Sequence, residues 1–356
     1  MSGAARAAGG IVGSLQERVA RLSPERRALL EALAGRVESE SPSPAPAGQA
    51  AGAGTGATPP SPPGSPPGSL LGPLPRPPAA PEASGSGLAR RQEVRGFYDR
   101  VNRQLSASGF AEHALFLNFG YVPNESESQA RVLPPPHAVN RNSLRLVLEV
   151  AGDCPLSAGS SVLEVGCGRG GALAVLSGCF GVRRIAGADL SLSALAFAGR
   201  GRRPPAGRLL AADAQALPLR SAAFDVVFNL ESSHCYPDRG EFYREVHRLL
   251  RPGGHFLYAD LLPAGELAGC RETLAALGFA CERETDITGN VLLSCDETAR
   301  VRARAFGGSA AVDALDDAAA FVGVPGSPLY EAMKHGEQRY MSWKLRRDAA
   351  PRSLAG

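Results

Sequence analysis

The sequence lacks the features that mark exported and membrane proteins. It has no apolar stretch of the roughly 18 residues that a membrane-spanning helix requires, and its N-terminus is a run of Ala and Gly without a signal-like apolar core. Its seven cysteines are scattered, with no C-x-x-C pair and no zinc-like spacing. An odd number of scattered cysteines without a signal peptide is typical of free thiols in a reducing compartment. We therefore expect a soluble, cytoplasmic protein.

The net charge is also small. The formal net charge is +3, without long runs of one sign, so no face typical of nucleic-acid binding is indicated. No Asp, His or Glu residues cluster at metal-ligand spacing, and we expect no metal in the site. The function must therefore rest on other motifs.

Proline and glycine are unevenly distributed. Of the 29 prolines, 14 lie between Pro42 and Pro81, and residues 38–88 consist almost wholly of Pro, Ala, Gly and Ser, which predicts a flexible linker. Residues 1–37 before it have helical periodicity. Within them the stretch from Leu22 to Leu33 resembles the helical linkers that flank carrier domains in polyketide and non-ribosomal peptide synthases. A marginal helix in a tail is the alternative interpretation. The resemblance implies that this segment contacts a megasynthase or carrier protein.

Strand and helix signals alternate through the rest of the chain. Residues 89–150 predict a helical lead-in that closes over the main domain, and residues 151–348 predict a doubly wound, mostly parallel α/β sheet. A helical insertion is expected at about 290–335. The expected parallel strands are 161–165, 184–189, 208–212, 224–229 and 255–260, and the strands of an antiparallel closing hairpin are 279–286 and 338–346. The expected helices between them are 171–178, 192–199, 239–250 and 266–277.

A glycine-rich turn follows the first expected strand. Glu164-Val-Gly-Cys-Gly-Arg-Gly170 has glycines at 166, 168 and 170, which permit a tight turn and the close approach of a ligand to the backbone. The spacing differs from the dinucleotide pattern G-x-G-x-x-G. Asp189, at the end of the second expected strand, can accept hydrogen bonds from ribose hydroxyls. Both features indicate a nucleoside-containing ligand.

Three further motifs select one family. They are Ala212-Asp-Ala-Gln-Ala-Leu-Pro-Leu219, the following Phe224-Asp-Val-Val, and Glu245-Val-His-Arg-Leu-Leu-Arg-Pro-Gly-Gly254. Their order and spacing are those of the class I S-adenosylmethionine-dependent methyltransferases, which this sequence resembles. The resemblance implies a Rossmann-like fold and S-adenosylmethionine as cofactor, with Asp213 accepting from the adenine amino group. The cofactor-binding residues that it implies are Tyr121, Glu164, Gly166, Gly168, Gly170, Asp189, Leu190, Asp213, Ala214 and Asn229.

A narrower resemblance concerns the substrate. The segments 229–237, 257–261 and 321–330 resemble the phthiotriol and phenolphthiotriol dimycocerosate methyltransferases, and equally the O-methyltransferase domains of polyketide synthases. The resemblance implies methylation of a hydroxyl on a lipid-like or polyketide acyl chain, presented on a carrier protein. No specific chain follows from it.

The loop after the fourth expected strand holds the candidate catalytic groups. An aliphatic hydroxyl reacts as a nucleophile once a general base takes its proton. His234 is our candidate base, because an imidazole with its usual pKa near 6.5 can take a proton near neutral pH. Glu231 is expected to orient the His234 ring or share the proton transfer, and Tyr236 and Asp260 are expected to contact the substrate, with Asp260 as an alternative base.

Other interpretations stay open at this level. His234 can be a hydrogen-bond donor in the wall of the pocket, and Glu231 can touch the cofactor or cap a helix. Methylation of carbon in a terpenoid, sterol or other small molecule is the alternative reaction. In that reaction Glu231, Asp260 and Tyr236 would be the main catalytic groups, because acidic and aromatic side chains stabilise the charge that develops. A non-enzymatic cofactor sensor is a third possibility, which the intact Glu164, Asp189 and Asp213 disfavour.

Overall fold

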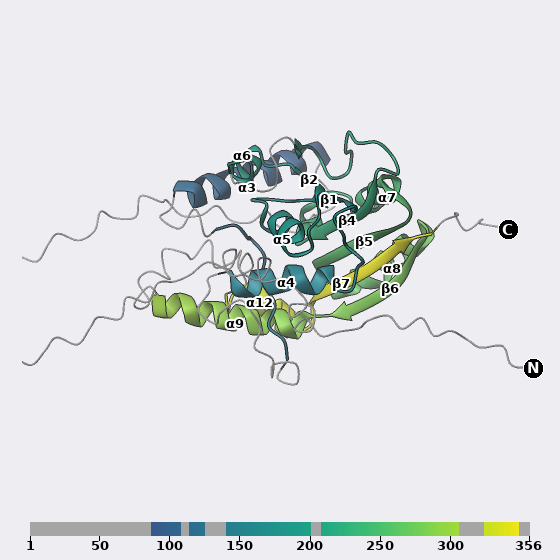
Figure 1. Ribbon diagram of the computed structural model, residues 1–356. Coiled ribbons are helices and arrows are strands. Elements are labelled where there is room, and N and C mark those ends of the chain that lie inside the picture. The colour runs from purple at the N-terminus through teal and green to yellow at the C-terminus, as the bar shows by residue number, and fades with distance from the viewer. Residues whose placement is uncertain (1–86, 108–113, 125–139, 201–207, 306–323, 349–356) are drawn as a thin grey trace, which may run out of the picture.

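A seven-stranded sheet with helices on both faces forms the body of the protein (Figure 1). The structure, a computed structural model, describes residues 87–107, 114–124, 140–200, 208–305 and 324–348. The strands are β1 (Ser161–Val165), β2 (Arg184–Asp189), β3 (Leu209–Ala211), β4 (Phe224–Leu230), β5 (Leu250–Pro263), β6 (Phe279–Asp286) and β7 (Gln338–Arg347). The helices of four or more residues are α3 (Gly87–Ala107), α4 (Arg141–Ala151), α5 (Gly171–Cys179), α6 (Leu192–Ala198), α7 (Arg239–Leu249), α8 (Leu267–Ala276), α9 (Thr288–Ala305) and α12 (Pro328–Lys334).

The strand order is β3-β2-β1-β4-β5-β7-β6. β1 pairs in parallel with β2 and β4, and further parallel pairs join β2 to β3 and β4 to β5. β7 runs antiparallel to both β5 and β6. This arrangement confirms the predicted Rossmann-like sheet, including the antiparallel closing strands. The chain order reverses at β1, so the loops after β1 and β4 diverge and leave a crevice at their carboxyl ends.

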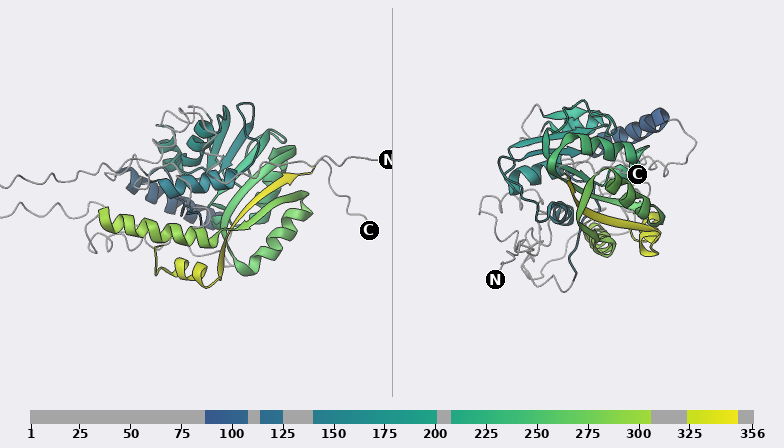
Figure 2. Two further views of the ribbon diagram at one scale, coloured as in Figure 1. Left: turned by 60° about the horizontal axis from the view of Figure 1, so that its bottom comes forward. Right: turned by 90° about the vertical axis from the view of Figure 1, so that its right-hand side faces the viewer.

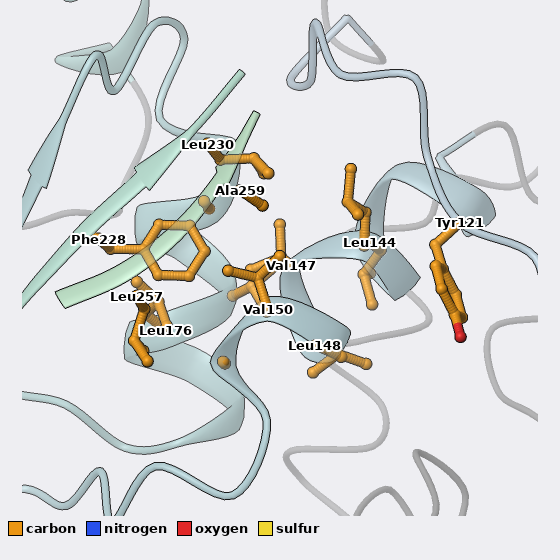
Figure 3. Close-up of a cluster of buried hydrophobic side chains, with 14 of the residues drawn as sticks. Tyr121, Leu144, Val147, Leu148, Val150, Leu176, Phe228, Leu230, Leu257 and Ala259 are labelled. Carbon is orange, nitrogen blue, oxygen red and sulfur yellow. The ribbon is translucent and has the colours of Figure 1, made fainter. Parts of the chain in front are cut away.

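The two faces of the sheet bury separate apolar clusters because successive side chains of a strand point to opposite sides. In β4, Phe228 belongs to one apolar cluster with Val150 of α4 and Leu176 of α5 (Figure 3). Its neighbour Val227 packs with Phe242 and other residues on the α7 side. All five residues of β1 are buried, as expected for a parallel strand covered on both faces. The packing fixes the position of the glycine-rich turn that follows β1.

The largest difference from the expected element boundaries is at the junction of α7 and β5. α7 ends at Leu249, and β5 begins at the next residue rather than at residue 255. Pro252 disfavours helical geometry in the residue before it, and Gly253 has a φ of +80°, so the chain reverses soon after the helix. The predicted strand 255–260 is the centre of β5.

The lead-in helix α3 lies beside α6 along one edge of the molecule (Figure 1). The predicted helical segment 1–37 and the linker up to residue 86 lie outside the described residues, as do residues 306–323 of the predicted insertion. The rest of that insertion holds α9 and α12, which lie together below the sheet (Figure 2). None of the described helices is long and apolar enough to cross a membrane.

Candidate active site

A cavity of about 980 Å³ opens at the carboxyl ends of β1, β2 and β4. Its walls come from the glycine-rich turn, α3, residues 115–119, the loop after β4 and α12. The structure brings together most of the predicted site residues in this wall, namely Glu164, Gly166, Gly168, Asp189, Leu190, Asp213, Ala214, Glu231, His234 and Tyr236. Sequence positions far apart in the chain therefore share one cavity.

The glycine-rich turn requires its glycines. Gly166, Gly168 and Gly170 have φ angles of +73°, +49° and +83°, which residues with a Cβ rarely adopt. A Cβ at Gly166 would lie 2.3 Å from Ser232 Oγ, whereas a Cβ at Gly168 would meet nothing within 4 Å. Gly170 precedes α5 and shapes the turn without lining the cavity. The open space above Gly168 is room for a ligand against the backbone.

Two acidic side chains are buried beside this turn. Asp189 accepts hydrogen bonds from the backbone N–H groups of Gly168 (2.7 Å) and Ser191 (2.8 Å), while burial raises its pKa. Glu164 is 4% exposed, and its Oε2 has no hydrogen-bond partner. Burial, and then the nearby charge of Asp189, raise the pKa of Glu164 well above its usual range. Glu164 lines the cavity, and a buried acidic group in such a lining suits a ligand with hydroxyl or ammonium donors.

Asp213 and Ala214, the predicted adenine-binding residues, also line the cavity. Asp213 accepts from the Gln215 backbone N–H at 3.0 Å and forms an ion pair with Arg91 of α3. The predicted adenine-binding carboxylate therefore already has a cationic partner, which no sequence motif indicated.

Helix α3 is fastened over the cavity at two further points. Asp99 accepts hydrogen bonds from Ser191 Oγ (2.7 Å) and Ser193 Oγ (2.8 Å) at the start of α6. Arg169, the charged residue inside the glycine-rich turn, is 2% exposed. It donates to the Asn102 carbonyl (3.3 Å) and to Ser106 Oγ (3.1 Å). Sequence reasoning missed this fastening, although an arginine between two glycines was a visible signal.

His234 and Asp260 form a hydrogen-bonded pair at the cavity. His234 Nδ1 lies 2.7 Å from Asp260 Oδ1, and its side chain is 34% exposed while Asp260 is fully buried. Although burial acts against a charged ring, the neighbouring Cys235 and Asp260 raise the pKa of His234 well above its usual range. Burial likewise acts to raise the pKa of Asp260, but the His234 ring and several hydrogen bonds hold it below its usual range. Asp260 thus holds one nitrogen of the His234 ring in place, and the Cys235 side chain is a further hydrogen-bonding neighbour of the ring.

Asp260 does not line the cavity, which corrects the prediction that it contacts the substrate. Both of its oxygens are occupied within the protein, by Ser233 Oγ (2.6 Å), the backbone N–H groups of His234 and Leu261, and the His234 ring. It orients His234, the role that we had expected of Glu231.

Glu231 holds a different segment. Its two carboxylate oxygens accept from the Phe119 backbone N–H at 2.9 and 3.1 Å, and Tyr340 Oη donates to it at 2.6 Å. Burial raises the pKa of Glu231 to about 8, although these hydrogen bonds act in the opposite direction. Glu231 also has a φ of +48°, a strained conformation that folded proteins retain mainly at functional sites. It fixes residues 117–119 in the cavity wall.

Two predicted cofactor contacts lie behind the wall. Tyr121 is 5% exposed and lies beside Leu144 in the apolar cluster (Figure 3), so it packs in the core rather than against the cofactor. Asn229 is fully buried, and its amide donates to the Val165 carbonyl (2.8 Å) and Ser232 Oγ (2.7 Å). Asn229 thereby supports the glycine-rich turn from below. Neither residue lines the cavity.

Tyr236 does face the cavity, with Oη 2.9 Å from Ser232 Oγ, and burial raises its pKa. Next to it, Cys235 Sγ lies 3.4 Å from Tyr98 Oη of α3. All seven cysteines lie within the described residues, and each is a free thiol, as predicted. Among the described residues, no three or more His, Cys, Asp or Glu side chains are arranged to hold a metal ion.

Comparisons with known proteins identify the family. A family model described as a methyltransferase domain matches residues 163–258. The "Probable phthiotriol/phenolphthiotriol dimycocerosates methyltransferase 2" of Mycobacterium ulcerans is 35% identical over 200 residues, which cover 56% of this chain and 75% of the relative. The chain belongs to the class I S-adenosylmethionine-dependent methyltransferases. It is an enzyme of that family, and its cofactor is S-adenosylmethionine.

Two other similarities bear on this methyltransferase. The fatty-acid O-methyltransferase of Mycolicibacterium smegmatis is 37% identical over 164 residues, 46% of this chain and 59% of the relative. The crystal structure of geranyl diphosphate C-methyltransferase from Streptomyces coelicolor, in complex with S-adenosyl-L-homocysteine among other ligands, has a TM-score of 0.50 at 16% identity. It covers 75% of this chain and 100% of that one. That likeness concerns the fold.

Proposed function

We propose that this methyltransferase transfers a methyl group to a hydroxyl of a polyketide or lipid-like acyl chain that is presented on a carrier protein. The observation that carries the proposal is the His234–Asp260 pair beside the glycine-rich turn. The lipid methyltransferases among the relatives support the substrate class, and the carrier is suggested by the resemblance of residues 22–33 to synthase linkers.

The cofactor supplies an electrophilic methyl group on a sulfonium centre. Glu164, with its unpartnered oxygen, would accept from the amino group of the methionine end, and Asp189 would accept from the ribose hydroxyls. Asp213 and Ala214 would hold the adenine. These positions follow the family pattern, and the buried acids and the open space over Gly168 fit such a ligand.

His234 takes the proton of the substrate hydroxyl in this proposal. Asp260 keeps the Nδ1 proton on its own side of the ring, which leaves Nε2 as the basic nitrogen, and it stabilises the imidazolium that forms. Residues 117–119 and α3 cover the cavity and exclude water, which would otherwise compete with a poorly nucleophilic alcohol.

Carbon methylation is the alternative reaction. It would rely on acidic groups that face the substrate, but Asp260 is turned away from the cavity and both oxygens of Glu231 are taken by Phe119 and Tyr340. A hydroxyl acceptor with His234 as base is therefore favoured.

The test is the intact mass of carrier-bound 3-hydroxyacyl and 3-ketoacyl chains after incubation with S-adenosylmethionine. A gain of one methyl on the hydroxy chain alone is expected, and a gain on the keto chain would instead indicate carbon methylation. His234→Ala should lower the rate by about 100-fold or more, the usual contribution of a general base, while calorimetry gives unchanged cofactor affinity. His255→Ala is the matched control, because His255 pairs with Glu282 and does not line the cavity. Unchanged turnover in His234→Ala would refute the assignment of the base.

A further inference from the structure

We propose that α12 forms the end wall of an acyl-chain subsite, and that Ala332 sets the length of chain that this enzyme accepts. The inference rests on the proposed function, which it extends from the reacting hydroxyl to the rest of the substrate. It concerns the part of the cavity that lies beyond the cofactor-binding residues.

The subsite begins beside the proposed base. The Leu261 backbone N–H donates to Asp260 Oδ1 at 2.8 Å, the same oxygen that holds the His234 ring. Leu261 and Pro263 lie two positions apart on β5, so their side chains share one face of the strand, and both line the cavity. An apolar wall therefore leads away from His234 along β5.

This wall continues directly into α12. Pro263 is paired with Gln338 at the start of β7. At that junction the Ala264 N–H donates to the Glu337 carbonyl (2.8 Å), and the Glu337 N–H donates to the Ala332 carbonyl (2.9 Å). Pro328, Leu329 and Ala332 line the cavity, and positions four apart such as 328 and 332 share one face of a helix.

Helix α12 is firmly held in this position. Met333, which follows Ala332, is 2% exposed within the apolar cluster, and Tyr330 Oη donates to Asp296 of α9 at 2.9 Å. Ser327 caps the helix by accepting from the Tyr330 N–H at 3.3 Å. The cavity face of α12 is thus fixed by packing and can act as a rigid stop.

The shape and chemistry of this region suit an aliphatic chain. Pockets for one small ligand begin at about 300 Å³, so a cavity of about 980 Å³ holds a second molecule beside the cofactor. The carboxylates that line the cavity on this side have partners within the protein, because Glu231 is bound to Phe119 and Tyr340 and Glu266 forms an ion pair with Arg239. Each methylene buried against such a wall raises affinity about fourfold.

Ala332 is the position at which chain length can be altered. It has the smallest side chain on the cavity face of α12, so Ala332→Trp would fill the end of the subsite. Lys334→Trp adds the same ring two residues away, where the side chain is 58% exposed and does not line the cavity. The two variants separate loss of space from a general effect on α12.

The experiment compares kcat/KM of the full chain for 3-hydroxybutyryl and 3-hydroxytetradecanoyl pantetheine thioesters. In Ala332→Trp the long-to-short ratio should fall at least tenfold, with unchanged cofactor affinity, and in Lys334→Trp it should stay within twofold of the wild type. An unchanged ratio, or equal losses for both chains, would overturn the subsite. Should Ala332→Trp fail to fold by circular dichroism, Ala332→Leu is judged by the same ratio at a threefold threshold.

Failure of the proposed function would look different. In that case the wild-type enzyme would methylate neither thioester. The subsite is then decided by calorimetric binding of 1-tetradecanol to the wild type and to both variants. Weaker binding in Ala332→Trp alone supports it, and equal binding in all three overturns it.

Discussion

The substitution Asp260→Asn tests the proposed mechanism directly, because it changes the group that pairs with the His234 ring. Asp260 accepts four hydrogen bonds, two at each oxygen, whereas an asparagine offers one acceptor oxygen and one donor group. With the amide nitrogen facing the ring, Nδ1 must accept and the proton moves to Nε2, which blocks the basic nitrogen. With the amide reversed, the nitrogen faces the His234 backbone N–H. Either placement leaves a buried donor unmatched.

Two magnitudes follow. A buried unmatched donor costs about 1–3 kcal/mol of stability, so the melting temperature should fall measurably. The turnover should fall by about 100-fold, within the range that a general base contributes, while the affinity for S-adenosylmethionine stays unchanged. Turnover is measured by transfer of a radiolabelled methyl group, and affinity by calorimetry.

The pH dependence of the rate is an independent test of the His234–Asp260 pair. Asp260 raises the pKa of His234, and the reaction requires the neutral ring, so the wild-type rate should rise with pH through that raised pKa. In Asp260→Asn the remaining rate should begin to rise at lower pH, because the ring loses its anionic partner.

Asp225→Asn is the matched control. Asp225 accepts from the Ser161 N–H at 2.8 Å and pairs with Arg251 at the amino end of β4, away from the cavity. It should lower stability without moving the pH profile. An Asp260→Asn enzyme with the wild-type profile and turnover would refute the role of the pair.

Two further predictions concern the other buried acids. Glu164→Gln should raise the melting temperature of the cofactor-free protein, because it removes a desolvated acidic group whose Oε2 has no partner. The same substitution should weaken S-adenosylmethionine binding about tenfold. Equal affinity in calorimetry would argue against a contact between Glu164 and the cofactor. Glu231→Gln should raise KM for the acyl substrate several-fold with a smaller effect on kcat, because a single amide oxygen cannot accept from both Phe119 and Tyr340 as the two carboxylate oxygens do. A loss confined to kcat would instead point to direct catalysis by Glu231.

Local sequence signals located many of the residues that line the cavity beside the glycine-rich turn. The glycines at 166, 168 and 170 are required by backbone geometry at three positive φ angles. Asp189 follows from the rule that parallel strands present their carboxyl ends to the ligand. These signals act within one strand-turn-helix unit, so they can be read without knowledge of the rest of the chain.

Contacts between side chains that are distant in the sequence were harder to predict. Glu231 and Asp260 are both acids near His234 in the expected fold, and sequence alone assigned the ring partner to Glu231, three residues away. The choice depends on the register between β4 and β5, which sets Leu230 beside Ala259 and brings Asp260 to the His234 ring. The same holds for Tyr121, whose placement in the core depends on packing against α4.

The sequence by itself determined the fold class and the cofactor, because both are encoded in contiguous segments whose backbone requirements are local. Only the tertiary structure decided that Asp260 pairs with His234, that Arg91 of α3 pairs with Asp213, and that α12 lines the cavity. Those features arise between segments more than 20 residues apart in sequence, where strand register and helix packing, rather than any local pattern, bring the side chains together.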